Sequence, residues 1–153
     1  MKIMTEVSIN KQARLSEHFT LAEMCKTSAK TQDGNIPSHV HIENLKRLCG
    51  WLEMLRSEYK EAPIIINSGY RSAAVNKAVG GVPSSNHLTG CAADIRVENM
   101  QQLLRYAVIL LDIADESKEA FDELLIEKNA RGAIWLHFAV RPQNNRMRIR
   151  LIH

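Results

Sequence analysis

A stripe of apolar residues at three- to four-residue spacing runs through residues 38–59. Its members are Ile42, Leu45, Leu48, Leu52 and Leu55. This spacing is typical of an amphipathic helix with one apolar face. Pro37 and Ser38 mark its start. The leucines on this face are therefore predicted to be core residues.

A second helical pattern follows Asn99. Asn99 and Gln102 occupy the N-cap position and the third helical position, where a side-chain oxygen satisfies a free backbone N–H. The apolar face consists of Leu103, Leu104, Ala107, Val108, Leu110 and Leu111. A short helix is also expected up to Cys25, with Thr20 as its cap and Glu23 in the capping-box position.

Strand patterns come in five short pieces. They lie at 64–66, 91–97, 124–127, 134–140 and 147–152. Between the first two, residues 68–90 are rich in Gly and Ser and have no strong period. A long irregular stretch inside a compact domain is usually functional. Helices followed by short strands and loops predict an α+β domain with a small, mainly antiparallel sheet flanked by helices.

Composition limits the classes of protein that fit. The 153 residues, 45% of them hydrophobic, suit a single domain spanning 1–153, with residues 1–14 loosely ordered. A net charge of +3 and an aromatic fraction of 5% argue against a nucleic-acid partner. No apolar run is long enough to span a bilayer, so no membrane partner is expected, and we expect a monomer.

The cysteines and the N-terminus bear on the compartment. Cys25, Cys49 and Cys91 are an odd number without a CxxC pair, which fits a reducing compartment. Residues 1–19 lack the apolar stretch of a signal peptide. The chain is therefore expected to be made in the cytoplasm.

Two histidines and an aspartate suggest a metal site. His87 and Asp94 are separated by a segment of mostly small residues, in which Gly90 permits a turn. Further on, residues 135–140 alternate like a strand, which places Trp135 and His137 on one face. Two imidazoles and one carboxylate are a normal ligand set for a catalytic zinc ion with a position open for water. On spacing alone, three unrelated polar residues would be the better interpretation.

Several motifs in a fixed order make the pattern more specific. They are SGYR at 68–71, VNKAVGG at 75–81, SxHxxGxAxDI at 85–95 and WxH at 135–137. With these motifs the chain resembles the zinc D-alanyl-D-alanine carboxypeptidases and the related phage endolysin peptidases that cut peptidoglycan stem peptides. The resemblance begins near Leu15 and covers nearly the whole chain. It implies the fold that these enzymes share with the Hedgehog signalling domain.

The resemblance also implies roles for single residues. One zinc ion would be bound by His87, Asp94 and His137. Arg71 would bind the terminal carboxylate of the substrate or stabilise the oxyanion, tasks that suit the guanidinium group. Ser85 would donate a hydrogen bond to the same carboxylate. The alternative for Arg71 is a surface salt bridge.

The sequence departs from the family pattern at the position where relatives carry the general base. Relatives commonly place an acidic residue or a histidine just before the last zinc histidine, but Ile134 and Trp135 stand there and neither can transfer a proton. The segment FDELLIE at 121–127 resembles the version in which a glutamate ends the preceding strand. Glu127 is therefore the predicted base, with Glu123 in reserve and a structural carboxylate as the alternative. Trp135 would line the substrate site as an apolar wall.

The predicted function is a zinc peptidase acting on peptidoglycan stem peptides. It would be a carboxypeptidase if Arg71 binds a free C-terminus, and an endopeptidase if the cleft is open. Because this substrate lies outside the cytoplasm, a phage-type release route is the expectation. The alternative is a non-catalytic zinc domain that binds cell wall or protein, which Trp135 favours.

Three other patterns have simpler interpretations. The last strand would carry a basic stripe made of Arg146, Arg148 and Arg150. One interpretation is that this stripe binds nucleic acid; the simpler one is that it is the solvated face of an edge strand. Cys91 is expected to be a small buried apolar residue. His39 and His41 diverge on a helix and are expected to be solvated.

Overall fold

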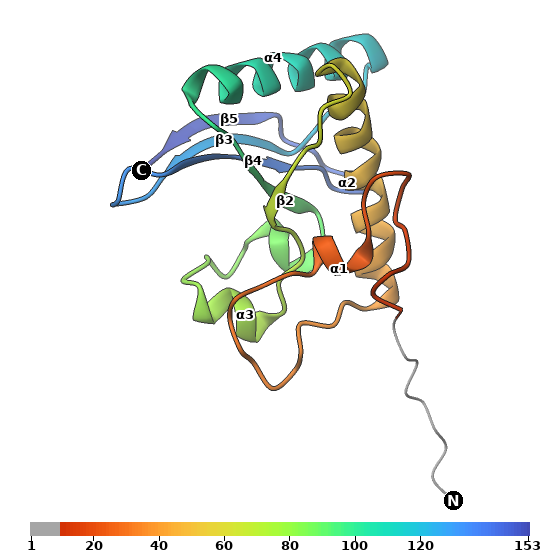
Figure 1. Ribbon diagram of the computed structural model, residues 1–153, viewed down its shortest axis with the longest axis vertical. Coiled ribbons are helices and arrows are strands. Elements are labelled where there is room, and N and C mark those ends of the chain that lie inside the picture. Colours follow the sequence, from red (N-terminus) through yellow and green to blue (C-terminus); the bar gives the residue numbers. More distant parts are fainter. Residues whose placement is uncertain (1–9) are drawn as a thin grey trace, which may run out of the picture.

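The computed structural model describes residues 10–153 (Figure 1). The helices are α1 (Leu21–Met24), α2 (His39–Glu58), α3 (Ala73–Ala78), the 3-10 helix η1 (Asn86–Thr89) and α4 (Met100–Ser117). The strands are β1 (Ile66–Ser68), β2 (Ala92–Arg96), β3 (Glu123–Lys128), β4 (Ile134–Ala139) and β5 (Arg148–Ile152). None of the helices in this part of the chain is long and apolar enough to cross a bilayer.

The strands form one sheet in the order β1-β2-β4-β3-β5. The β1–β2, β2–β4 and β3–β4 pairs are antiparallel, whereas β5 lies parallel to β3. The sheet is thus mixed but mainly antiparallel, and the predicted α+β class is confirmed.

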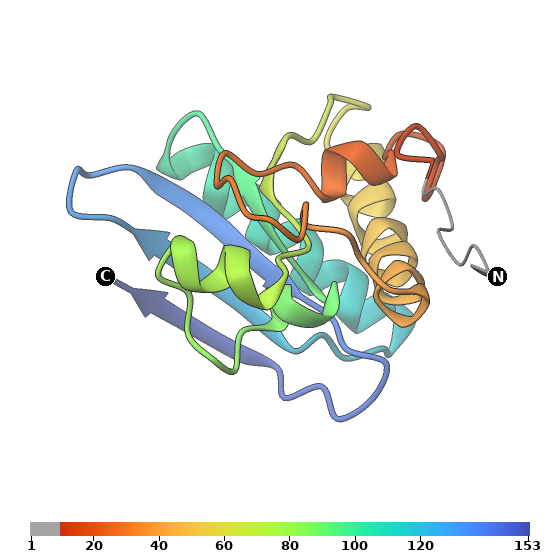
Figure 2. The ribbon, with the colours of Figure 1, turned by 90° about the horizontal axis from the view of Figure 1, so that it is seen from below.

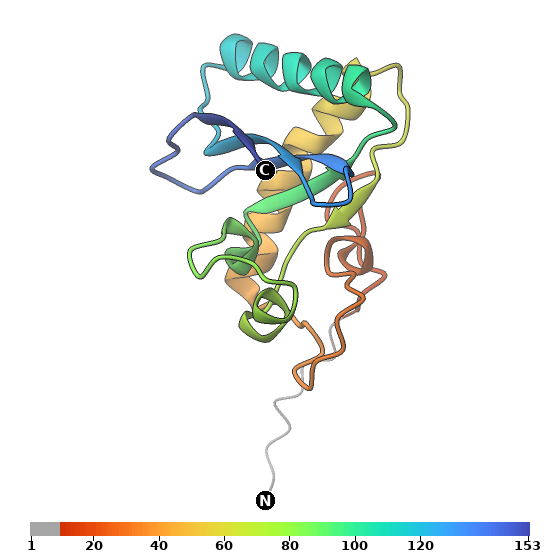
Figure 3. The same ribbon diagram turned by 90° about the vertical axis from the view of Figure 1, so that its left-hand side faces the viewer.

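The sheet separates two layers. Helices α2 and α4 pack against each other and cover one face of the sheet, with α4 above β4 (Figure 3). The irregular segment that contains α3 and η1 lies over the opposite face (Figure 2). This second face, which carries no long helix, leaves room for a site.

Alternation along the strands assigns side chains to these layers. On β4, Leu136 and Phe138 are fully buried and belong to the hydrophobic core with the helices. Their partners from α2 are Leu45, Leu48, Leu52 and Leu55, and from α4 they are Leu103 and Leu110. Burying one such side chain stabilises the fold by about 1.5–3 kcal/mol.

The helix starts follow the capping residues. Asn99 Oδ1 accepts a hydrogen bond from Gln102 N at 2.8 Å, and Thr20 Oγ1 accepts one from Glu23 N at 3.2 Å. At the start of α2, Ser38 Oγ accepts from His41 N at 3.3 Å. These three predicted starts are confirmed.

His41 is less solvated than expected. Its Nδ1 accepts a hydrogen bond from Ser38 N at 3.2 Å, which completes the capping box. The His41 ring also stacks on Tyr70, with the ring centroids 4.9 Å apart. These two contacts leave the ring half-buried, while His39 is exposed as expected.

The first strand lies later than predicted. The ladder with β2 starts at Ile66 and ends at Ser68, with a register shift between them. Ile65 contributes only its carbonyl, which accepts from Arg96 N at 2.9 Å. The apolar run identified the strand, but the partner strand determines which of its residues are paired.

At the N-terminal end, the prediction of loose order for residues 1–14 lies partly outside the described residues. Within them, the carbonyls of Lys11 and Ala13 accept hydrogen bonds from Ala22 N and Leu21 N. Cys91 is buried immediately before β2, as predicted.

Candidate metal centre

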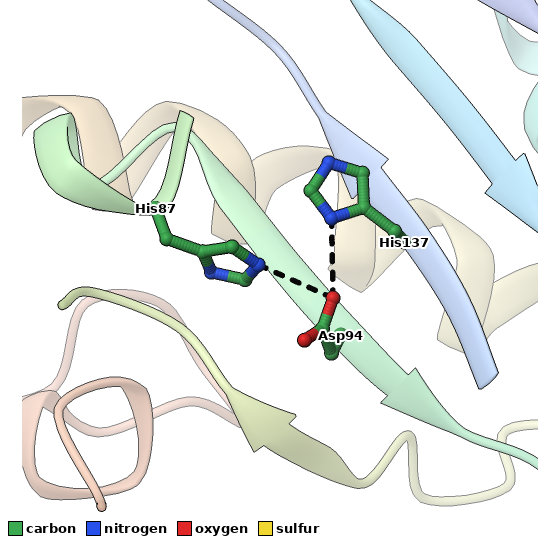
Figure 4. Close-up of side chains that lie close together, drawn as sticks. All are labelled: His87, Asp94 and His137. Atoms are coloured by element: carbon green, nitrogen blue, oxygen red, sulfur yellow. Dashed lines mark hydrogen bonds and ion pairs between the residues drawn. The ribbon is translucent and has the colours of Figure 1, made fainter. Parts of the chain in front are cut away.

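Three side chains from different elements converge on the open face of the sheet (Figure 4). Asp94 on β2 is directly paired with His137 on β4, and His87 approaches from η1. Asp94 Oδ1 lies 3.2 Å from His87 Nε2 and 3.1 Å from His137 Nδ1. All three residues are buried.

Local structure brings His87 over the sheet. Ser85 caps η1, and its Oγ accepts a hydrogen bond from His87 N at 3.1 Å. The chain then turns at Gly90, which has a φ of 76°. A Cβ at this position would lie 2.6 Å from the His41 carbonyl oxygen of α2, so only glycine fits here.

A backbone carbonyl determines which nitrogen of His87 faces the centre. The Gly69 carbonyl accepts a hydrogen bond from His87 Nδ1 at 2.7 Å. Burial lowers the pKa of His87, so the ring is neutral and Nε2 presents a lone pair towards Asp94. Gly69 itself must be glycine, because a Cβ would lie 2.3 Å from the Met24 carbonyl oxygen.

His137 is held from the other side by a carboxylate. Its Nε2 donates to Glu123 Oε1 at 3.0 Å, while Nδ1 faces Asp94. Burial opposes a charge on this ring, but the hydrogen bonds to Asp94 and Glu123 outweigh it and raise the pKa of His137 to about 9. Burial likewise opposes the charge of Asp94, and the hydrogen bond from His137 outweighs it and holds the pKa of Asp94 well below the ordinary range.

The arrangement fits a small divalent cation. Two ligands of one tetrahedral zinc ion, each about 2.0–2.1 Å from it, lie about 3.4 Å apart. The two distances from Asp94 Oδ1 are close to this value, and all three ligand atoms lie within 4.8 Å of one another. His87 Nε2 and the Asp94 carboxylate are both acceptors, so a cation between them would satisfy both. The predicted ligand set therefore converges in space.

Arg71 lies beside this group and is not a surface salt bridge. Its Nε donates to Ser68 Oγ at 3.0 Å, and one terminal nitrogen donates to Asp94 Oδ2 at 3.1 Å. The other terminal nitrogen donates to Asn76 Oδ1 at 3.3 Å. These contacts leave the Arg71 side chain 15% exposed and direct it into the groove.

The two candidate bases occupy different positions. Glu127 Oε1 lies 3.4 Å from His137 Nδ1, the nitrogen that faces the centre. Burial raises the pKa of Glu127. Glu123 contacts the far nitrogen of the same ring and also accepts from Asn86 Nδ2 at 2.7 Å. Burial opposes the charge of Glu123, and the hydrogen bond from His137 outweighs it and lowers its pKa.

The remaining predicted residues line the same groove, which has a volume of about 540 Å³. Trp135 is half-buried in its wall and lies opposite Glu127 on β3. Ser85 also lines the groove. Its oxygen already accepts from His87 N, so the structure adds a capping role that the sequence did not indicate.

Comparison with known proteins agrees with this geometry. Residues 17–112 match the family described as Peptidase M15, which is more than half of the chain. The chain belongs to the peptidase M15 family. A relative, the zinc D-Ala-D-Ala carboxypeptidase of Streptomyces albus G, is 31% identical over 78 residues. That alignment covers 51% of this chain and 31% of the length of the relative.

The family match ends before two important elements of this M15 chain. It includes His87 and Asp94 but stops before β3 and β4. His137 and Glu127 are therefore placed at the centre by strand pairing: His137 is opposite Asp94, and Glu127 is opposite Trp135.

A buried polar network beneath the groove of the M15 chain was missed by sequence reasoning. Asp122 is fully buried and accepts two hydrogen bonds from the Arg146 guanidinium, at 2.9 and 2.7 Å. Asn86 Nδ2 donates to the same carboxylate at 2.7 Å. Burial opposes the charge of Asp122, but these donors outweigh it and lower its pKa to about 2. The sequence signal that could have identified Asn86 and Asp122 is their position directly beside His87 and Glu123.

The expectation of a solvated arginine stripe holds for Arg146 and Arg150, which are exposed, whereas Arg148 is half-buried. Arg146 precedes β5 and is bound to Asp122, and Arg148 points towards Glu123, with 3.5 Å between the terminal nitrogen and the carboxylate. Arg150 is exposed. Strand β5 is an edge strand as expected, but its arginine face borders the groove.

Replacing Asp122 with asparagine is expected to lower the free energy of unfolding by about 2 kcal/mol, because it removes the buried negative charge that accepts hydrogen bonds from Arg146 and Asn86. Urea unfolding at pH 7 measures this difference. The pKa of Asp122 is depressed in the folded state, so its contribution is present above about pH 4 and lost as the pH falls towards 2. The gap between wild type and D122N should shrink over that range; a gap that is constant with pH would contradict the assignment.

Proposed function

We propose that this M15 chain is a zinc-dependent peptidase that hydrolyses peptidoglycan stem peptides. The observation that carries the proposal is the convergence of His87 Nε2, Asp94 Oδ1 and His137 Nδ1. The proposal is supported by family membership and by the printed activity of the Streptomyces albus G relative.

The ligand set suits zinc in particular. Two imidazole nitrogens and one carboxylate oxygen leave room for water or substrate, as in catalytic rather than structural zinc sites. When bound, zinc lowers the pKa of water and polarises the carbonyl that is attacked. The Gly69 carbonyl and the Glu123 carboxylate would hold His87 and His137 with the correct nitrogens facing the ion.

Glu127 is the proposed general base. Its carboxylate lies beside the ligating nitrogen of His137, so it can accept a proton from the attacking water and then donate it to the departing amine. A raised pKa suits both steps, because a base works best when its pKa approaches the working pH. Glu123 already accepts hydrogen bonds from His137 and Asn86. Its proposed role is therefore to orient the His137 ring, not to transfer a proton.

Arg71 is the proposed substrate-binding cation. Its Nε and terminal nitrogens are fixed by Ser68, Asn76 and Asp94, so the guanidinium is pre-oriented beside the metal group. It would bind either the C-terminal carboxylate of a stem peptide or the oxyanion formed at the scissile carbonyl. The first case makes the protein a carboxypeptidase and the second also allows an endopeptidase. Ser85 and Trp135 would complete the substrate-binding wall.

Digestion of purified peptidoglycan and synthetic stem peptides tests the proposal. The zinc-loaded protein is expected to release defined peptide fragments, detected by mass spectrometry, because the ion and Glu127 together activate water. Removing the metal with a chelator should stop hydrolysis, and adding zinc should restore it. A protein that binds zinc but is inert on every stem peptide would contradict the proposal and favour a non-catalytic binding domain.

A further inference from the structure

The groove runs across the strands and has cationic groups at both ends. Arg71 is bound to Ser68 on β1, and the metal group lies over β2 and β4. Beyond it, Glu123 on β3 is in register with Arg148 on β5. The metal group therefore lies between Arg71 and the arginines of the β5 edge.

Beside the start of β5, positive groups outnumber negative ones in the groove, while Glu127 lies at the other end of the β3–β5 pair, opposite Ile152. Three arginines line the groove beside the start of β5, Arg141, Arg146 and Arg148, and two carboxylates face them, Asp122 and Glu123. Arg146 saturates Asp122 through two hydrogen bonds. The negative charge of Glu123 therefore has to balance the positive charges of both Arg141 and Arg148.

The Glu123 carboxylate is shared between Arg148 and His137. Its Oε1 accepts from both His137 and Asn86, while Arg148 approaches the other oxygen only to 3.5 Å. In addition, Arg148 Nε is buried and has no hydrogen-bond partner within residues 10–153. A buried donor without an acceptor is uncommon in folded proteins, and it means that no hydrogen bond fixes the Arg148 guanidinium at this nitrogen.

Arg141 is anchored in a way that leaves its outer nitrogens available. Its Nε donates to Asn86 Oδ1 at 2.9 Å and lies 3.2 Å from Asp122 Oδ2. Its side chain is 30% exposed and lines the groove. Arg141, which is held at its Nε, and Arg148 line the same groove. Together they are a suitable arrangement for a carboxylate, which accepts several N–H donors at once.

We propose that Arg148 and Arg141 form a subsite for a second free carboxylate of the substrate peptide, distinct from the group bound by Arg71. This inference rests on the proposed function, since it identifies the kind of stem peptide that the groove accepts. Strands β4 and β5 are two spacings apart, about 10 Å, which is about three residues of extended peptide. The carboxylate would therefore lie within about three residues of the scissile bond.

Two groups in a stem peptide have the required chemistry. One is the α-carboxylate of a glutamate linked through its side chain, and the other is the second carboxylate of a diamino diacid. In both cases amidation removes the negative charge and leaves the size nearly unchanged. Comparing amidated and free peptides therefore distinguishes the two sources.

Equilibrium binding tests the subsite independently of hydrolysis. A stem peptide whose scissile amide is replaced by a reduced, uncleavable bond is titrated calorimetrically into the zinc-loaded protein. Three forms are compared: both carboxylates free, the glutamate amidated, and the diamino acid amidated. We expect one of the two amidations to weaken binding about ten-fold, and R148Q to reduce that preference to less than two-fold.

Variants make the result interpretable. R141Q should reduce the preference for the free carboxylate as R148Q does, and it provides the same test if R148Q fails to fold. R131Q removes an exposed arginine from the turn between β3 and β4, so it should keep the full preference. Equal affinity for all three peptides, no binding of any of them, or a preference that survives both R148Q and R141Q would overturn the subsite.

Hydrolysis of the matching cleavable peptides separates this inference from the proposed function. Discrimination in binding without any cleavage would keep the subsite and overturn the peptidase. Cleavage without discrimination would keep the peptidase and overturn the subsite.

Discussion

Replacing His137 with alanine is expected to abolish stoichiometric zinc binding and, with it, all hydrolysis. The substitution removes one of the three proposed ligands and leaves the carboxylates of Asp94 and Glu123 without their shared donor. Loss of a supporting contact to a ligand typically lowers metal affinity 10- to 100-fold, so loss of the ligand itself should lower it by more than about 100-fold. Elemental analysis and competition with a chromophoric chelator measure the effect.

A matched histidine provides the control for this experiment. His39 is exposed at the start of α2, and H39A should retain one zinc ion per chain with unchanged affinity. Circular dichroism of H137A without metal separates loss of the ligand from loss of the fold. Full zinc content at wild-type affinity in a folded H137A would show that the ion binds elsewhere.

Replacing Glu127 with glutamine is expected to keep zinc but lower kcat/KM for stem peptides by about 10²- to 10⁴-fold, the usual contribution of general acid–base catalysis. Glutamine keeps the size of the side chain but cannot accept the proton of the attacking water. Steady-state hydrolysis measured together with zinc content checks the prediction.

Glu123 is the informative comparison, because it is the other acidic side chain that contacts His137. It contacts the ring at Nε2, whereas Glu127 lies nearest Nδ1. E123Q should therefore weaken zinc binding, and added zinc should restore much of its activity, which it cannot do for E127Q. If E127Q hydrolyses stem peptides at the wild-type rate, Glu127 is not the base.

The parts of the fold that depend on local sequence could be predicted. Apolar spacing and capping residues placed α2 and α4, and Ser38 and Asn99 form the expected caps. The limits of β1 and the parallel pairing of β5 with β3 could not be predicted. Both depend on which distant strand lies alongside, and period-two alternation carries no information about the partner.

The candidate site also contains residues that the sequence could identify and residues that it could not. His87, Asp94 and His137 were identifiable because each lies in a recognisable motif, and the structure brings the three together. The partners of the buried Asp122 were not identifiable, since Arg146 comes from a segment 24 residues further along the chain. An arginine that neutralises a buried carboxylate has the same local sequence pattern as one that faces solvent.

The positions of Glu123 and Glu127 around the His137 ring also required the structure. Two glutamates four residues apart on a strand point to the same face, so alternation treats them alike. Their registers with β4 differ, with Glu123 opposite Ala139 and Glu127 opposite Trp135. The two carboxylates therefore reach His137 from opposite sides.

Anomalous X-ray diffraction at the zinc absorption edge, from crystals of the zinc-loaded protein, tests the proposed metal centre most directly. We predict one strong peak about 2.0–2.2 Å from His87 Nε2, an oxygen of Asp94 and His137 Nδ1, with Glu127 facing its open side. A map with no peak between these three atoms, or with its strongest peak at other side chains, would contradict the metal centre and the chemistry built on it.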